Sequence, residues 1–363
     1  MKNKMTEQPK TLRDLLEQEV IKLARLPQKN DFLLVDDRID LSRLDSLEGY
    51  TIPLTDHDYG AKTPLMWNSL YERLGLNIRN IMVVANPKDL ELIVDVFRQD
   101  PKYLGGGFGS GFKDVGIKYL DKVSPEDLEA VNIVVKKEGK IVGYNTDAQG
   151  FLRSLEDKFK EIGKDTKGAN YVILGAGGVA KEIVRLIAQK NPGRIAILNR
   201  TISKAVDLAA KINAQYGGKS GIAVAGGEDI IRGYLLNSFI RPDAIINLTN
   251  KGSDGTFEDF AAFATADDKG YNENISRTIA RELSRLNPEV IVADITLHKS
   301  GKTKTLRIAE NEGLKNIIDG IPMVVNQAAP AYIYVQEAHP KIHKKIISEE
   351  EALSVFREVT KLE

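Results

Sequence analysis

The stretch Tyr171-Val-Ile-Leu-Gly-Ala-Gly-Gly-Val-Ala180 contains an apolar run, a glycine turn and the beginning of a helical pattern. A second apolar run, Ile195-Ala-Ile-Leu-Asn-Arg-Thr201, follows it. Together they predict a strand–helix–strand unit. Further strand candidates alternate with helical stretches over residues 223–224, 244–247 and 290–294. This alternation predicts a doubly wound parallel sheet, so the expected fold class is α/β.

The glycine turn also predicts a dinucleotide site. Gly175 permits a tight turn after the strand, Gly177 lets the backbone approach a pyrophosphate, and Ala180 keeps the helix close to the sheet. The free N–H groups at the start of the helix would face the phosphates. Glycine turns of this kind also occur without a ligand, so the residues after the second strand decide the cofactor.

Those residues are Asn199-Arg200-Thr201, at the point where NAD-binding folds usually carry an acidic side chain for the ribose hydroxyls. A guanidinium binds phosphate through paired hydrogen bonds, so Arg200 favours the 2′-phosphate of NADP(H). Lys204 offers a second positive charge. The alternative is a solvated helix start at which Thr201 only caps the helix.

Length and composition limit the possible function classes. At 363 residues the chain is long enough for about two domains. Lys and Arg together number 51, as do Asp and Glu, so no net charge attracts nucleic acid or an anionic membrane. The absence of Cys excludes disulfides, thiolate catalysis and Cys-bound metal. We see no signal peptide and no membrane span, and therefore expect a cytoplasmic protein.

Local periodicity predicts the remaining elements, which begin with an amphipathic helix over residues 10–26. A long polar helix over 267–286 has no role that the sequence reveals. The other expected elements are helices over 63–74, 89–97, 149–159 and 323–336, a strand over 80–85, and a hairpin formed by 129–135 and 140–144.

A second group of motifs surrounds Gly143-Tyr-Asn-Thr-Asp147-Ala-Gln-Gly150. A glycine-rich segment, 105–111, precedes Lys113, and Ala130-Val-Asn132 precedes a predicted strand; Gln327-Ala-Ala lies near the C-terminal helix. With the glycine turn and the Asn-Arg-Thr sequence, these motifs resemble the shikimate dehydrogenase family in order and approximate spacing. The resemblance covers about residues 50–340.

The resemblance implies an α/β substrate domain, a Rossmann domain for NADP(H) and a cleft between them. We therefore expect a helical extension over 1–46, a substrate domain over 47–150 with the C-terminal segment 323–363 packed on it, and a Rossmann domain over 151–322. The extension either packs on the substrate domain or mediates self-association into a homodimer. By position, the resemblance assigns catalysis to Lys113 and Asp147, and ring-hydroxyl binding to Asn132 and Gln327. The residues expected to bind NADP are Gly175, Ala176, Gly177, Gly178, Val179, Ala180, Asn199, Arg200, Thr201, Lys204 and Gly320.

The chemistry of the Lys113–Asp147 pair also follows from the residue types. Alcohol oxidation requires a hydride acceptor and removal of the hydroxyl proton. An ammonium beside a carboxylate can bind the hydroxyl, stabilise the developing alkoxide and relay its proton. We expect Lys113 to be the acid/base and Asp147 its partner. The alternative is a surface lysine after a glycine loop and an aspartate that only caps a helix.

The sequence departs from the family pattern mainly at the positions that bind the carboxylate of the substrate. Family members place two serines before a proline and a following His-Asn pair, whereas this chain has Ala61 and Thr63 for the serines and Trp67 for the histidine. The tyrosine that commonly follows a late aspartate is Leu297. Recognition of a carboxylate then depends on Lys62 or Thr63.

The expected protein is an NADP(H)-dependent oxidoreductase of the shikimate dehydrogenase type, in aromatic amino acid biosynthesis, that acts on shikimate or a related cyclic polyol or hydroxy acid. One alternative is a non-catalytic NADP(H)-binding sensor that lost its substrate. Another is a nicotinamide enzyme for a folate-like or amino-acid substrate.

Two further expectations concern metal and mobility. Of the four histidines, only His339 and His343 are close in sequence, and their lysine-rich surroundings favour a solvated turn, so we expect no metal site. The glycine run 105–111 lacks a phosphate-loop pattern, and we expect a mobile loop over the substrate or a simple exposed loop.

Overall fold

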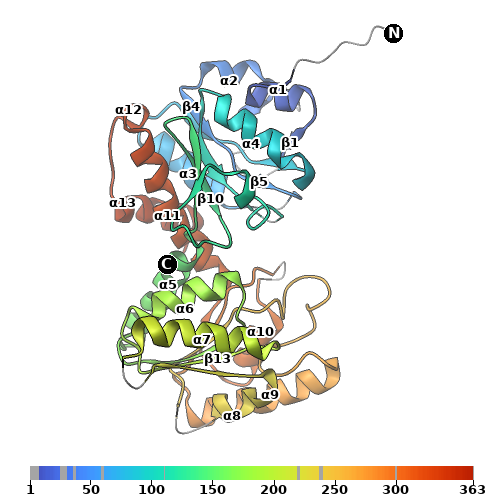
Figure 1. Cartoon of the computed structure of the whole chain (residues 1–363), viewed down its shortest axis with the longest axis vertical. Helices are drawn as coiled ribbons and strands as arrows, with labels where there is room; N and C mark the ends of the chain where they lie inside the picture. The colour runs from blue at the N-terminus through green and yellow to red at the C-terminus, as the bar shows by residue number, and fades with distance from the viewer. Residues whose placement is uncertain are drawn as a thin grey trace. The chain divides into compact units, whose positions relative to one another are not determined.

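The computed structural model describes residues 8–24, 31–35, 38–58, 61–109, 111–218, 221–236, 240–298 and 301–362. The chain forms two compact units (Figure 1). Unit 1 contains residues 1–146 and 327–363, and unit 2 contains residues 147–326.

Unit 2 is built on one sheet of six parallel strands in the order β14-β13-β12-β15-β16-β17. This is the strand order of a dinucleotide-binding fold, and it confirms the predicted doubly wound sheet. The strands are β12 (Asn170–Leu174), β13 (Arg194–Leu198), β14 (Ala223–Gly226), β15 (Ala244–Asn247), β16 (Ile291–Asp294) and β17 (Asn316–Ile318).

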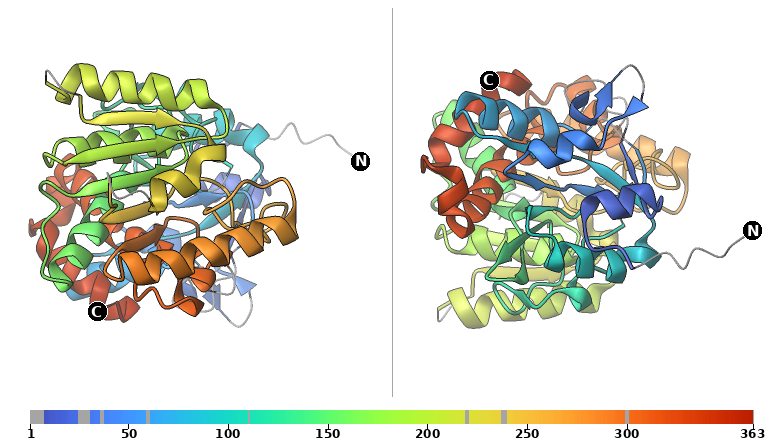
Figure 2. Two further views of the ribbon diagram at one scale, coloured as in Figure 1. Left: turned by 90° about the horizontal axis from the view of Figure 1, so that it is seen from below. Right: turned by 90° about the horizontal axis from the view of Figure 1, so that it is seen from above.

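Helices cover both faces of this sheet (Figures 1 and 2). Alternate side chains of a strand point to opposite faces, so Tyr171 and Ile173 join one buried cluster and Val172 and Leu174 join the other. The first cluster packs under α5 (Asp147–Glu161), α6 (Gly178–Ala188) and α7 (Ile202–Tyr216); the second packs under α8 (Ile231–Leu236), α9 (Lys269–Leu286) and α10 (Lys304–Asn311).

Unit 1 contains a mixed six-stranded sheet in the order β6-β4-β8-β10-β11-β9 and a three-stranded sheet in the order β1-β7-β5. The predicted hairpin is confirmed, because β10 and β11 pair antiparallel around Glu138 and Gly139, which both have positive φ. The strands are β1 (Ile21–Leu23), β2 (Leu34–Val35), β3 (Arg38–Ile39), β4 (Gly49–Thr51), β5 (Leu54–Thr55), β6 (Ile78–Asn80), β7 (Val83–Ala85), β8 (Tyr103–Gly107), β9 (Lys122–Val123), β10 (Ile133–Lys137) and β11 (Lys140–Tyr144).

The helices of unit 1 include the C-terminal part of the chain. The predicted helix over 323–336 is part of α11 (Gly320–Ala338), whose residues from 327 onward belong to unit 1. The others are α1 (Leu12–Glu17), α2 (Ser42–Ser46), α3 (Thr63–Arg73), α4 (Leu90–Gln99), α12 (Pro340–His343) and α13 (Glu349–Thr360), and α13 packs against α3. Among the described residues, no helix combines the length and apolarity needed to cross a membrane.

Two local predictions are wrong. The helix expected over 10–26 ends at Glu17, because Glu19 adopts a left-handed conformation (φ 56°) and Ile21–Leu23 then pairs with β7 as a strand. The single strand expected over 80–85 is split into β6 and β7, which belong to different sheets. In both places tertiary strand pairing overrides local periodicity.

The glycine run 105–111 begins as a strand and not as a loop. Residues 105–107 are the end of β8, a central strand of the sheet. A side chain at Gly106 would place its Cβ 2.0 Å from the Ile52 carbonyl oxygen. These glycines therefore permit close strand packing rather than mobility.

Candidate active site

The glycine turn lies at the carboxyl end of β12, and Gly175 is required there by the fold itself. Its φ is +114°, its N–H donates to the Leu198 carbonyl, and an added Cβ would lie 2.8 Å from the Leu248 carbonyl oxygen. Ala176 and Ala180 are buried. The turn is thus fixed between the ends of β13 and β15.

Gly177 and Gly178 differ from Gly175 because no heavy atom lies within 4 Å of a Cβ built on either. The packing of the protein does not require glycine at these positions. Gly177 is the N-cap of α6 and has no side chain that could accept hydrogen bonds from the first turn. The N–H groups at the start of this helix can therefore donate to an anion. Bare backbone, open space and a helix N-terminus fit the pyrophosphate of a dinucleotide.

Asn199 connects the glycine turn with the next loop. Its Oδ1 accepts from the Ala176 N–H at 3.1 Å, and its Nδ2 donates to the Thr201 carbonyl at 2.9 Å. Thr201 makes no side-chain capping bond at the start of α7, contrary to the capping alternative. Arg200 and Lys204 are exposed beside it, which leaves positive charge at the place expected for a 2′-phosphate.

A buried ion pair lies near this positive edge and was not anticipated from the sequence. Lys251 Nζ donates to Glu228 Oε2 at 2.9 Å and to the Ala264 carbonyl at 2.7 Å. Burial lowers the pKa of Lys251, Glu228 raises it, and the charge of Arg200 lowers it further. Glu228 follows β14 and Lys251 follows β15, so the pair fixes two loops at the carboxyl edge of the sheet. In the sequence, the only sign of this ion pair is that Glu228 and Lys251 both follow strands of the parallel sheet.

Asn132 and Gln327, both assigned from the sequence, meet in unit 1. Asn132 Nδ2 donates to Gln327 Oε1 at 3.1 Å and to Thr146 Oγ1 at 3.0 Å. The Thr146 hydroxyl donates to Gln327 Oε1 at 2.9 Å, and its N–H donates to Asn132 Oδ1 at 2.9 Å. Thr146 was not assigned a role, although it is the centre of the Asn-Thr-Asp motif.

Lys113 is held next to this group. The Val131 N–H donates to the Lys113 carbonyl at 2.7 Å, and Val131 directly precedes Asn132. The side chain of Lys113 is half-buried. Asp147 follows Thr146, is 5% exposed and is the first residue of α5.

The expected carboxylate residues lie at the start of α3. Lys62 is the N-cap and Thr63 the first helical residue, and both are half-buried. Trp67 lies one turn later but is only 2% exposed, and its ring packs edge-on against Tyr71 and Tyr332. Trp67 is therefore a core residue, unlike the polar histidine that the family carries there.

Gly320, expected at the cofactor, has a structural reason to be glycine. It is buried at the start of α11, and a Cβ would lie 2.7 Å from the Ile295 carbonyl oxygen. This close approach fixes the segment after β16 against α11.

Comparisons with known proteins agree with this arrangement. A sequence model of the family described as "Shikimate / quinate 5-dehydrogenase" matches residues 157–220. The shikimate dehydrogenase (NADP(+)) of Alkaliphilus oremlandii is 31% identical over 285 residues, which cover 77% of this chain and 88% of that protein. A shikimate 5-dehydrogenase from Listeria monocytogenes, crystallised with shikimate and NAD, is 25% identical with a TM-score of 0.62 and covers 88% of this chain and 99% of its own. A shikimate dehydrogenase crystallised with NADP⁺ is 24% identical with the same TM-score and covers 85% and 95%.

Proposed function

The chain belongs to the shikimate dehydrogenase family and is an NADP(H)-dependent oxidoreductase of that type, and we propose that its substrate is a cyclic polyol related to shikimate whose ring hydroxyls, rather than a carboxylate, provide recognition. The observation that carries this proposal is the Asn132–Thr146–Gln327 group beside Lys113. Amide and hydroxyl groups are the partners that ring hydroxyls need.

In this proposal Lys113 binds the reacting hydroxyl and removes its proton during oxidation, and Asp147 is the carboxylate of the catalytic pair. In the reverse direction the Lys113 ammonium returns the proton to the ketone oxygen. NADP(H), when bound at the glycine turn, accepts or supplies the hydride. Arg200 and Lys204 select the 2′-phosphate.

The departures at α3 support a changed substrate. Trp67 occupies the core, and Ala61 cannot donate a hydrogen bond from its side chain. A second candidate is shikimate itself, with its carboxylate bound by Lys62.

The test is a turnover assay with shikimate, quinate and neutral cyclitols, using NADP⁺ and NAD⁺ in parallel. We expect Lys113→Ala to lower kcat by roughly 10²- to 10⁴-fold, because it removes the acid/base. Asp147→Asn should lower kcat as well, since it removes the carboxylate charge of the proposed catalytic pair.

Lys62→Ala distinguishes the two substrate classes, with Lys88→Ala, an exposed lysine of the same unit, as its matched control. If Lys62 binds a carboxylate, its loss raises KM for shikimate and leaves KM for a neutral cyclitol unchanged. Equal shikimate kinetics in the wild type and in Lys62→Ala would refute the Lys62 site. Cofactor binding without turnover of any ring alcohol would contradict the polyol proposal and favour the sensor alternative.

A further inference from the structure

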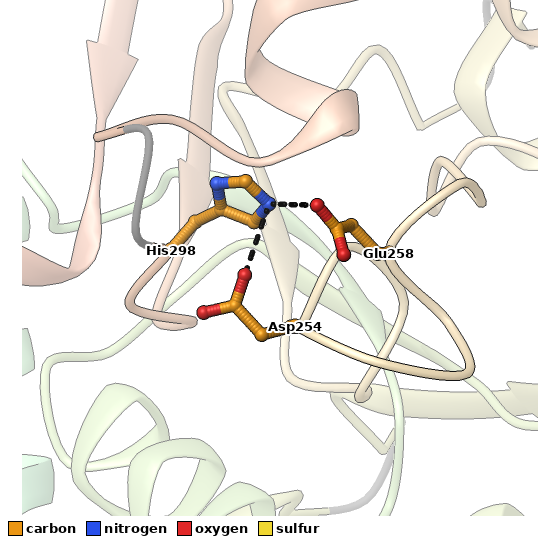
Figure 3. A group of neighbouring side chains, drawn as sticks. All are labelled: Asp254, Glu258 and His298. Carbon is orange, nitrogen blue, oxygen red and sulfur yellow. Dashed lines mark ion pairs between the residues drawn. The ribbon is translucent and has the colours of Figure 1, made fainter.

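Three side chains of unit 2 converge on one point that the proposed reaction does not use (Figure 3). His298 follows β16, and Asp254 and Glu258 lie in the segment that follows β15. His298 Nε2 is 3.4 Å from Asp254 Oδ1 and 3.4 Å from Glu258 Oε1. The imidazole side chain is 2% exposed, whereas the carboxylates are 45% and 32% exposed.

The two distances are long for direct hydrogen bonds. A charge-assisted N–H···O bond usually measures about 2.7–2.9 Å. One ring nitrogen also carries at most one hydrogen, so it cannot donate a linear bond to both oxygens. A proton on His298 therefore accounts poorly for two carboxylates that face the same nitrogen.

A metal ion accounts for them better. A tetrahedral ion about 2.1 Å from each ligand atom holds those atoms about 3.4 Å apart. One ligand atom from each of the three residues lies within 4.8 Å of the others, and both contacts of His298 Nε2 already have that spacing. Imidazole with two carboxylates suits first-row divalent ions, zinc among them, better than magnesium or calcium.

The segments that carry the ligands are anchored to the sheet. Asn247 Nδ2 donates to Asp294 Oδ2 at 2.9 Å and to the Lys251 carbonyl at 3.1 Å, just before the acidic segment. Thr303, the N-cap of α10, donates to the same Asp294 carboxylate at 2.7 Å, just after the histidine segment. One buried amide–carboxylate pair thus fixes both segments at their bases.

The acidic segment is also closed on itself. The Gly252 N–H donates to the Phe257 carbonyl at 2.8 Å, and the Glu258 N–H donates to the Gly255 carbonyl at 3.1 Å. A Cβ at Gly252 would lie 2.8 Å from Thr303 Cβ, so this segment packs against the start of α10. Ligand positions held in this way require little reorganisation on binding.

We propose that Asp254, Glu258 and His298 bind one first-row divalent metal ion, with zinc the preferred ion, and that the ion joins the two segments. Water completes the coordination. The expectation of no metal site, which rested on the His339–His343 pair and its lysine-rich surroundings, is replaced by this proposal. The site uses none of the residues assigned to Lys113-dependent chemistry.

The test is calorimetric titration of Zn²⁺ into the full chain after dialysis against a chelator, with thermal unfolding as a second readout. We expect one Zn²⁺ per chain, a raised Tm, and much weaker binding of Mg²⁺. Loss of a residue that merely supports a metal ligand typically costs 10- to 100-fold in affinity, so His298→Ala should cost at least about tenfold. Glu258→Gln and Asp254→Asn, at more exposed positions, should each weaken binding without disturbing the buried ring.

The matched control is His57→Ala, because His57 is exposed and pairs with one carboxylate, Asp56, at 2.6 Å. This variant should bind Zn²⁺ as the wild type does. Cobalt(II) gives an independent readout, since its visible spectrum reports the ligand set and should change in His298→Ala. No Zn²⁺ binding by the wild type, or equal affinity in the wild type, His298→Ala and Glu258→Gln, would overturn the proposal.

Discussion

At the scale of single residues, the cofactor preference depends on Arg200. It is exposed after β13, next to a threonine that makes no capping bond. A hydrogen bond to a charged group contributes about 1.5–3 kcal/mol, so Arg200→Ala should raise KM for NADP⁺ by roughly tenfold or more. KM for NAD⁺ should not change, since NAD⁺ has no 2′-phosphate. Initial-rate kinetics with both cofactors measure this.

Arg194→Ala is the control, because Arg194 is an exposed arginine at the opposite end of the same strand. It should leave both KM values unchanged. A similar loss with NAD⁺ and NADP⁺ in Arg200→Ala would mean that Arg200 supports the loop rather than the phosphate.

Residue types predicted part of the site and missed part. The motifs indicated Asn132 and Gln327, and the structure places them in contact although 195 positions separate them. The Lys251–Glu228 pair and the group around His298 carry no local signature. Each forms only because parallel strands deliver their following loops to one edge of the sheet.

At the scale of elements, close packing of β8 depends on glycine. The Cβ of an alanine at position 106 would lie 2.0 Å from the Ile52 carbonyl oxygen and 2.4 Å from its carbon. Backbone cannot move aside as a flexible side chain can, so Gly106→Ala should lower the free energy of unfolding by about 3 kcal/mol, the upper end of the usual cost of overpacking. Chemical denaturation followed by circular dichroism measures the change.

The control for this change is Gly233→Ala, at an exposed position of α8 with open space around the added methyl group. Alanine is the better helix former, so this variant should gain up to about 1 kcal/mol. Equal stability of Gly106→Ala and the wild type would show that β8 can move away from Ile52.

Element prediction succeeded where the periodicity was long and failed where pairing partners were distant. The strand–helix alternation of unit 2 predicted its parallel sheet, because the four central strands (β13, β12, β15 and β16) are buried on both faces and read as apolar runs. In unit 1, the apolar residues from Leu12 to Leu23 fit a helix until β7 provides a strand partner for their second half. The glycines of β8 likewise have the composition of a loop, and only pairing with β4 and β10 makes them a strand.

At the scale of the whole molecule, unit 1 is assembled from both ends of the chain. The C-terminal segment brings Tyr332 and His343 into contact with Tyr71, and Tyr332 also meets Trp67. Trp67 is the single tryptophan of the chain. Its fluorescence therefore reports whether the returning segment remains packed in unit 1.

His343 should make that packing sensitive to pH. The solvated turn expected around His339 and His343 is wrong, because the His343 side chain is fully buried against Tyr71 and Tyr332. Burial lowers the pKa of His343 below the ordinary 6.5, against the opposing effect of the His339 carbonyl. The unfolded chain then binds more protons than the folded one as pH falls through about 6.5, so the free energy of unfolding decreases toward acid. His339, whose pKa burial also lowers, contributes in the same direction.

His343→Phe keeps a ring against Tyr71 and Tyr332 but cannot take up a proton. When the pH is lowered from about 7.5 to about 5.5, the free energy of unfolding of this variant should therefore decrease less than that of the wild type. The comparison does not depend on the stability of either protein at the higher pH. Denaturant unfolding followed by Trp67 fluorescence at both pH values gives the two differences directly. If the differences are equal, His343 takes up its proton while still packed, and the acid sensitivity of unit 1 resides elsewhere.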